Sequence, residues 1–470
     1  MNDDKDISEA KPTVTKFLLF CSIILTGLLV ALEVTKRLQL QPEAGYMLGI
    51  LVAAALLWST EAIPLFATSL MIIGAQIILL GNPGNWGFIN NNSIPEIPYS
   101  EFLSPISDPI IILFLGGFIL ARVGVKAKVD VYLSAVLLRI FGLSAQRTLL
   151  GVICITTLFG MWISNTATTA MMVTLTGSLL AFVPHGNSFR KGLVLAIPFS
   201  ANIGGIMTPI SSPPNAIALG LLHQEGAYIN FLTWMIIMLP LALVLLGILY
   251  FLLWFRYKPP LPLRMTPIEK KPFTAKGKFV VVIFSLTVLM WLTDSIHGIP
   301  AAVVALFPVI TFTATGMLSA KEFNRIEWNI LFIIAGGLSL GQGMNLSGLD
   351  NVLLGFLPVE SEWIVLIIFM ATLVLGTFMS NTTTAILFIP VAISLAQVMD
   401  HIQMEAMAMG LAVMAASSMA LPISTPPNAI AYATNELTVK DFAINGSVIS
   451  ICSMFITYGY FSLLAAIGIW

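Results

Sequence analysis

Charged residues are scarce in this sequence. Only 10% of its 470 residues are Asp, Glu, Lys or Arg, whereas soluble domains contain about 25%. Hydrophobic residues make up 57% of the chain, and the mean hydropathy is +0.94. Such a chain cannot cover its surface with polar side chains, so the composition excludes an ordinary soluble protein and predicts an integral membrane protein surrounded by lipid.

Cysteine and histidine are also rare. Cys21, Cys154 and Cys452 lie in apolar segments, so we expect packing roles and no disulfide framework. No HExxH motif or paired carboxylate occurs, so nothing indicates an enzyme, and we expect no catalytic residues, no organic cofactor and no nucleic-acid partner. The four histidines all lie at predicted segment ends: His185, His223, His297 and His401.

Two apolar segments are about twice as long as one membrane span. Segments 147–182 and 361–398 are each interrupted near the middle by Ser-Asn-Thr, at 164–166 and 380–382. Non-helical backbone at membrane depth needs protein or water around it. Each segment is therefore predicted to be a re-entrant helical hairpin with its tip at the triplet. Because polarity is confined to such points and forms no continuous stripe, a channel is disfavoured.

Two further apolar segments, 190–222 and 404–434, contain a Pro-Pro pair. Proline has no N–H to donate and restricts the residue before it. Both segments are therefore predicted to be broken helices.

Basic residues predict the orientation. Loop 256–278 contains seven Lys and Arg residues against one Glu, whereas loop 82–107 has acids and no Lys or Arg. With the basic side cytoplasmic, the segments predict an all-α fold of about eleven transmembrane helices plus two hairpins, with the N-terminus inside and the C-terminus outside a bacterial plasma membrane. The predicted parts are a tail at 1–16, a first helix and outer loop at 17–45, a first repeat at 46–255, a linker at 256–278 and a second repeat at 279–470.

The motifs are duplicated in the same order. Ser164 and Ser380 are 216 positions apart, and Pro213 and Pro426 are 213 apart. On the predicted topology the two hairpins enter from opposite sides, so the repeats are inverted. Inverted repeats with broken helices are typical of secondary transporters.

The duplicated residues are suited to bind a cation and an anion. Ser, Asn and Thr cap the start of a helix, whose free N–H groups attract an anion, and the preceding half-helix offers carbonyls to a cation such as Na⁺. Asn165 and Asn381 can donate and accept, so one amide can contact both ligands. A site with near two-fold symmetry favours a ligand with two similar ends, such as a dicarboxylate. Hydroxyls next to the Pro-Pro pairs belong to Ser211, Ser212, Ser424 and Thr425.

These paired triplets, with SSPPNAIA at 211–218 and STPPNAIA at 424–431 downstream, resemble the divalent-anion/sodium symporter family. The resemblance extends from about residue 46 to 468. It implies eleven membrane helices, two hairpins, a dimer and a moving transport domain. It also implies transport of succinate, malate, fumarate, citrate or sulfate, usually with Na⁺.

The resemblance also implies site residues, at the positions where this sequence matches the motifs of the family. One Na⁺ site would involve Ser164, Asn165 and the backbone around Ser211, where glycine is common in the family. A second Na⁺ site would involve Thr377, Asn381 and Ser424. Substrate carboxylates would contact Asn165, Thr166, Ser212, Pro213, Asn381, Thr382, Thr425 and Pro426.

The sequence thus predicts Na⁺-coupled symport of a C4-dicarboxylate by alternating access, with at least two Na⁺ sites. Na⁺-independent dicarboxylate exchange, and transport of citrate or sulfate, remain open alternatives.

Overall fold

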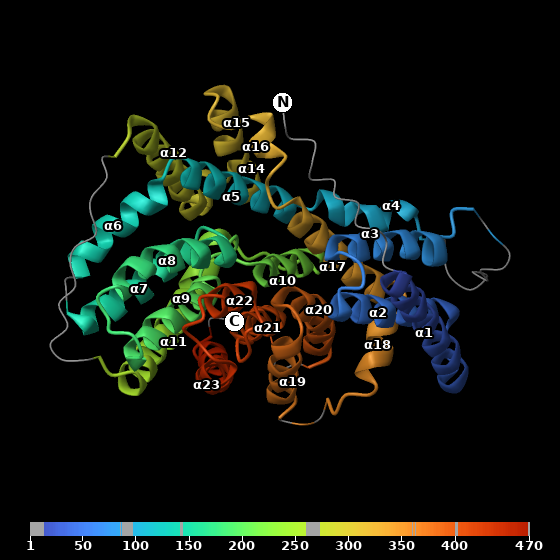
Figure 1. The fold of residues 1–470 in the computed structure, drawn as a ribbon. Coiled ribbons are helices and arrows are strands. Elements are labelled where there is room, and N and C mark those ends of the chain that lie inside the picture. Colours follow the sequence, from blue (N-terminus) through green and yellow to red (C-terminus); the bar gives the residue numbers. More distant parts are fainter. Residues whose placement is uncertain are drawn as a thin grey trace. The chain divides into compact units, whose positions relative to one another are not determined.

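A computed structural model describes residues 14–84, 86, 97–141, 144–259, 273–359, 361, 363–399 and 403–468. Every regular element in these ranges is helical, which confirms the all-α prediction (Figure 1). The chain forms two compact units. Unit 1 contains Met1–Ile106 and Ala335–Phe356, and unit 2 contains Ser107–Ile334 and Leu357–Trp470.

Unit 1 is held together by close contacts between small residues. A Cβ added to Gly27 of α1 would lie 2.8 Å from the carbonyl oxygen of Gly49 in α2, so the two helix backbones approach closely. The elements of unit 1 are α1 (Val14–Leu38), α2 (Pro42–Thr60), α3 (Leu65–Gln76), the π-helical η1 (Ile77–Gly81), α4 (Tyr99–Leu103), part of the 3₁₀ turn η2 (Ser104–Ser107), the end of α17 (Trp328–Leu346) and α18 (Leu349–Leu354).

Unit 2 contains both duplicated motifs. Its N-terminal helices are α5 (Pro109–Lys126), α6 (Val129–Phe141), α7 (Ala145–Gly160), α8 (Asn165–Leu180), α9 (Ser188–Gly204), α10 (Pro213–Gln224) and α11 (Phe231–Arg256). Then come α12 (Ala275–Leu292), α13 (Asp294–His297), α14 (Ala301–Val304), α15 (Leu306–Ala314), α16 (Ala320–Phe323) and the start of α17. The last five are α19 (Ile364–Phe378), α20 (Asn381–Val398), α21 (Met404–Ser417), α22 (Pro426–Tyr432) and α23 (Val439–Ala466).

Several helices are suited to a membrane. Within the described residues, eight helical segments are at least 18 residues long and apolar enough to cross a membrane. In α1, only 17% of the residues in the most apolar stretch are buried inside the protein. Among the shorter apolar helices are α7, α19 and α21. The total of about eleven spans and their orientation stay predictions.

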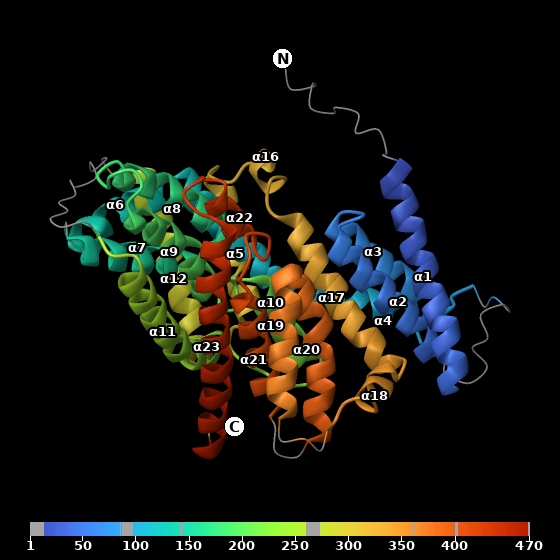
Figure 2. The same cartoon turned by 60° about the horizontal axis from the view of Figure 1, so that its bottom comes forward.

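The helices break where the triplets predicted. Helix α7 ends at Gly160 and α8 begins at Asn165, while α19 ends at Phe378 and α20 begins at Asn381. Helices α7 and α8 pack against each other, as do α19 and α20 (Figure 2). Each pair is therefore a helical hairpin with its triplet at the turn.

The Pro-Pro pairs also begin new helices. Pro213 is the first residue of α10 and Pro426 the first of α22, because a proline at the first helical position loses no hydrogen bond. The unwound segments are 205–212 and 418–425. Helix α10 packs on α20 and α21, and α22 packs on α8 and α9. Each half-helix therefore contacts the hairpin of the other predicted repeat.

Candidate functional site

The first tip is formed by Ser164 and Asn165. Ser164 caps α8, with its Oγ accepting a long hydrogen bond from the Ala167 N–H at 3.5 Å. The Asn165 amide lies against Gly205 at the start of the first unwound segment, where an added Cβ would be 2.5 Å from Nδ2. Asn165 Oδ1 is buried and accepts no hydrogen bond.

Asn215, the asparagine of the first Pro-Pro-Asn motif, stabilises the unwound segment that precedes it. Its Nδ2 donates to the carbonyls of Gly205 at 2.9 Å and Thr208 at 2.8 Å. Ser211 Oγ lies 2.7 Å from the same two carbonyl oxygens. These side chains supply donors that the broken helix lacks.

The second tip repeats this chemistry. Ser380 caps α20 by accepting from the Thr383 N–H at 3.1 Å, and Asn381 Oδ1 is again buried without a donor. In the second unwound segment, Asn428 Nδ2 donates to the carbonyls of Met419 at 2.9 Å and Leu421 at 2.8 Å. The two Pro-Pro-Asn asparagines therefore have equivalent roles.

A hydroxyl attaches each unwound segment to a matching position of its own hairpin. Thr208 donates to the Met161 carbonyl at 2.5 Å, and Ser424 donates to the Thr377 carbonyl at 2.7 Å. Met161 and Thr377 each precede the serine of their triplet by three positions. The internal duplication is thus visible in the hydrogen bonds as well as in the motifs.

The structure brings several predicted residues together. Ser424 contacts Thr377 directly, while Asn165 and Ser211 meet at Gly205. Asn202 of α9 donates to Thr425 Oγ1 at 3.3 Å, which links the two predicted repeats.

The side chains of the other predicted residues form no polar contact within the described part of the chain. Thr166 and Pro426 are exposed. Thr382 and Pro213 are half-buried. Ser212 is buried, and its Oγ has no hydrogen-bond partner.

Sequence reasoning missed Gly205, Thr208, Asn215, Asn428 and Glu327. The two asparagines stood within the duplicated PPNAIA motif, so the duplication itself was a signal for them. Gly205 and Thr208 lie in the unwound segment between the end of α9 and Pro213. Glu327 had no signal, because its contact with Ser164 spans 163 positions of sequence.

The tips contain neutral oxygen ligands. Hard cations such as Na⁺ bind carbonyl, amide and hydroxyl oxygens, and a buried acceptor without a donor is costly unless a ligand satisfies it. These residues therefore fit a cation of this kind. The buried oxygens without partners in and beside the tips include those of Asn165, Ser212, Asn215, Asn381 and Asn428.

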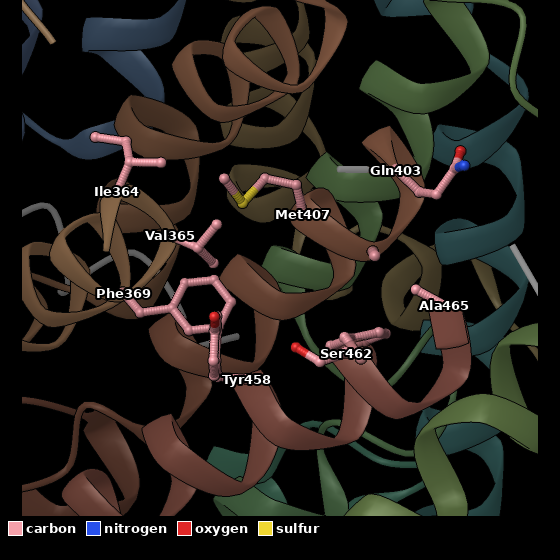
Figure 3. A pocket seen from close by; sticks show the side chains of 10 residues that line it. Ile364, Val365, Phe369, Gln403, Met407, Tyr458, Ser462 and Ala465 are labelled. Carbon is pink, nitrogen blue, oxygen red and sulfur yellow. The ribbon is translucent and has the colours of Figure 1, made fainter. Parts of the chain in front are cut away.

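Two other cavities suit a dianion less well. The cavity in Figure 3, of about 350 Å³, lies between α19, α21 and α23. Phe369, Met407 and Tyr458 project towards it, and none of the residues lining it is charged.

A second cavity, of about 340 Å³, is lined by Arg190, His185 and Glu436. Arg190 is paired with Glu436 and also donates to the carbonyls of Leu180 and Val183. The bonded guanidinium lowers the pKa of Glu436, against partial burial that raises it. Because its charge is already neutralised, Arg190 is a poor anchor for an anion.

An all-helical fold with hairpins and broken helices is that of an integral membrane transporter. A family model described as "Citrate transporter" matches residues 55–413 and 299–468. The chain therefore belongs to the citrate transporter family, whose members are transporters and not enzymes.

Curated relatives agree with this class. The sodium-dependent dicarboxylate transporter SdcS of Staphylococcus saprophyticus is 30% identical over 477 residues, covering 92% of this chain and 88% of that protein. The inorganic phosphate transporter PHO87 of Saccharomyces cerevisiae is 29% identical over 93% of this chain. The chain spans about half the length of PHO87 (48%) and of a similar uncharacterized transporter from Schizosaccharomyces pombe (47%).

A solved structure shares the fold. The YdaH transporter of Alcanivorax borkumensis, described as having an unusual topology, superposes with a TM-score of 0.55 at 13% identity. The match covers 86% of this chain and 97% of that one.

Proposed function

We propose that this protein is a secondary active transporter that couples Na⁺ to the uptake of a divalent C4-dicarboxylate such as succinate, malate or fumarate. Na⁺ would bind at two places: Ser164, Asn165 and the backbone around Ser211, and Thr377, Asn381 and Ser424. The substrate carboxylates would contact Asn165, Thr166, Ser212, Pro213, Asn381, Thr382, Thr425 and Pro426.

The observation that carries the proposal is the duplicated arrangement at the tips. Asn165 and Asn381 each present a buried amide oxygen with no donor, and the hairpin of each is tied to an unwound segment by a hydroxyl. Two such neutral sites suit two monovalent cations, whose charge would offset that of a dianion. The name of the SdcS relatives supports both Na⁺ and a dicarboxylate.

Alternating access would move the hairpins and broken helices against the remaining helices. We further propose a homodimer in a plasma membrane, with the N-terminus cytoplasmic and the C-terminus outside.

The competing substrates are citrate, from the family description, and phosphate, from the PHO87 relative. Phosphate and sulfate lack the two separated carboxylates that a two-fold site favours. Na⁺-independent exchange would require a fixed positive charge to balance the charge of the dianion. Neither the two Ser-Asn-Thr stretches nor the two Pro-Pro-Asn stretches contain Lys or Arg.

Uptake by the purified chain in liposomes tests the proposal. Labelled succinate is offered with an inward Na⁺ gradient or with choline in its place, and unlabelled malate, fumarate, citrate, phosphate and sulfate compete in parallel. We expect Na⁺-dependent succinate uptake, inhibited strongly by malate and fumarate and weakly by the inorganic anions. Liposomes preloaded with succinate should show counterflow.

Uptake that is unchanged in choline and driven by internal dicarboxylate would replace symport with exchange. Stronger inhibition by phosphate or citrate than by malate would reassign the substrate.

A further inference from the structure

A carboxylate that belongs to neither duplicated motif lies beside the first tip. Glu327 immediately precedes α17 and is half-buried. Ser164 Oγ donates to Glu327 Oε1 over a long 3.4 Å contact. The other carboxylate oxygen, Oε2, is buried and accepts no hydrogen bond.

A capping role does not explain this side chain. Asp108 precedes α5 in the corresponding way and caps it, accepting from the Ile110 N–H at 2.8 Å. Glu327 instead accepts from Ser164, 163 positions earlier in the sequence. In the part of the chain that the structure describes, no Lys, Arg or His forms an ion pair with Glu327.

Lys126, which binds the connecting segment that contains Glu327, is engaged by another acid. Lys126 is paired with Glu322, the acid five positions earlier, and donates to the Met317 carbonyl at 2.9 Å. Glu327 thus has no ion-pair partner among the described residues, and its carboxylate contacts the Ser164 hydroxyl at the first tip.

Among the residues that the structure describes, no carboxylate bonds to the serine of the second tip. Ser380 Oγ lies 2.8 Å from Thr383 Oγ1, a neighbour in its own helix. Glu327 therefore breaks the near two-fold symmetry of the tips and makes the first one more attractive to a cation.

We propose that Glu327 is a further Na⁺-binding residue of the first site, where its carboxylate joins Ser164 in holding the ion in the conformation described here. A carboxylate oxygen beside hydroxyl and amide oxygens is a ligand set for a hard cation. The full negative charge draws the ion more strongly than neutral oxygens can, because the site is partly removed from water. This inference rests on the Na⁺ coupling proposed above.

The test compares Glu327→Gln, Glu327→Asp and the matched control Glu405→Gln. Glu405 is a half-buried glutamate in the first turn of α21 and belongs to neither tip. For each purified full-length chain, NaCl is titrated against choline chloride at constant ionic strength. The readouts are the thermal unfolding temperature without substrate and the initial rate of labelled-succinate uptake in liposomes.

The Na⁺ concentration for half-maximal response should rise about tenfold in Glu327→Gln, since one full charge next to the ion is lost. Glu327→Asp should shift it less, and Glu405→Gln should match the wild type. The KM for succinate at saturating Na⁺ should stay unchanged. If Glu327 had only a structural role, Glu327→Gln would instead lower the unfolding temperature in choline. The Na⁺ concentration for half-maximal response, here called the Na⁺ midpoint, would then stay unchanged.

A Na⁺ midpoint in Glu327→Gln equal to that of the wild type would overturn the assignment of Glu327 and leave symport standing. If Glu327→Gln does not fold, an unshifted midpoint in Glu327→Asp has the same meaning. A wild-type chain without any Na⁺ response would remove the proposed symport and this inference with it.

Discussion

At the scale of single residues, the duplicated asparagines divide into two kinds. The amide nitrogens of Asn215 and Asn428 each donate to two backbone carbonyls of an unwound segment. The amide nitrogens of Asn165 and Asn381 make no such bonds with the described residues, and their unpartnered oxygens lie at the tips. One pair therefore maintains the broken helices, and the other is free to bind a ligand.

This division predicts opposite effects for two alanine substitutions. Asn381→Ala should reduce succinate uptake at least about tenfold with little change in thermal stability, because it removes a ligand and no recorded hydrogen bond. Asn428→Ala should destabilise the protein by about 2–4 kcal/mol, because two carbonyls lose their donor in a buried setting.

Uptake in liposomes and thermal unfolding in detergent measure the two effects. Normal transport by a well-folded Asn381→Ala chain would remove that residue from the site. An unchanged unfolding temperature in Asn428→Ala would show that the unwound segment does not depend on these bonds.

At the scale of elements, the unwound segments are confined by neighbouring helices that approach very closely. Helix α23 contacts the second unwound segment at Gly446. A Cβ added there would lie 2.4 Å from the Met419 carbonyl oxygen and 2.7 Å from Ala420 Cα. Both atoms are backbone, so they cannot rotate away. The absence of a side chain at Gly446 therefore lets α23 support the break.

Gly446→Ala should consequently lower the unfolding temperature and the uptake rate, because α23 must move away from the unwound segment. Gly459→Ala in the same helix is the matched control, since nothing lies within 4 Å of its added Cβ. The control should be neutral or stabilise by up to about 1 kcal/mol, from better helix propensity. Equal unfolding temperatures for the two variants would refute this account.

At the scale of the whole molecule, coupled transport requires that binding of the cation and binding of the substrate affect each other. The half-helices α10 and α22 each pack on the hairpin of the other predicted repeat. A cation bound at either tip would therefore order elements that also face the substrate. Coupling of this kind is reciprocal, so each ligand must raise the affinity for the other.

Thermal unfolding should show this reciprocity. Succinate in choline should stabilise the protein little, and NaCl alone should stabilise it moderately. Together they should stabilise by more than the sum, because a single ligand at 100 times its Kd contributes about 2.7 kcal/mol and each Kd falls when the other ligand is bound. Strictly additive shifts across a titration of both ligands would contradict the coupling.

Local chemistry explains how much could be predicted from the sequence. The helix starts at Asn165, Asn381, Pro213 and Pro426 were predictable, because a serine cap and a proline act on the backbone next to them. The all-helical membrane fold followed from composition and from the length of the apolar segments. The break between α5 and α6 near Lys128, which has a positive φ of 57°, was not predicted within the segment 108–141.

The sequence by itself determined that this protein is helical, resides in a membrane and has two sets of the same polar breaks. Only the tertiary structure decided which buried oxygens are already bonded and which are not. Ser211 and Ser424 occupy matching positions in the sequence, yet the Ser211 hydroxyl donates within its own segment and the Ser424 hydroxyl donates to the hairpin. The contact between Ser164 and Glu327 likewise depends on how distant helices pack. Such contacts escape sequence patterns because a hydrogen bond requires two groups to meet in space, and folding alone brings them together.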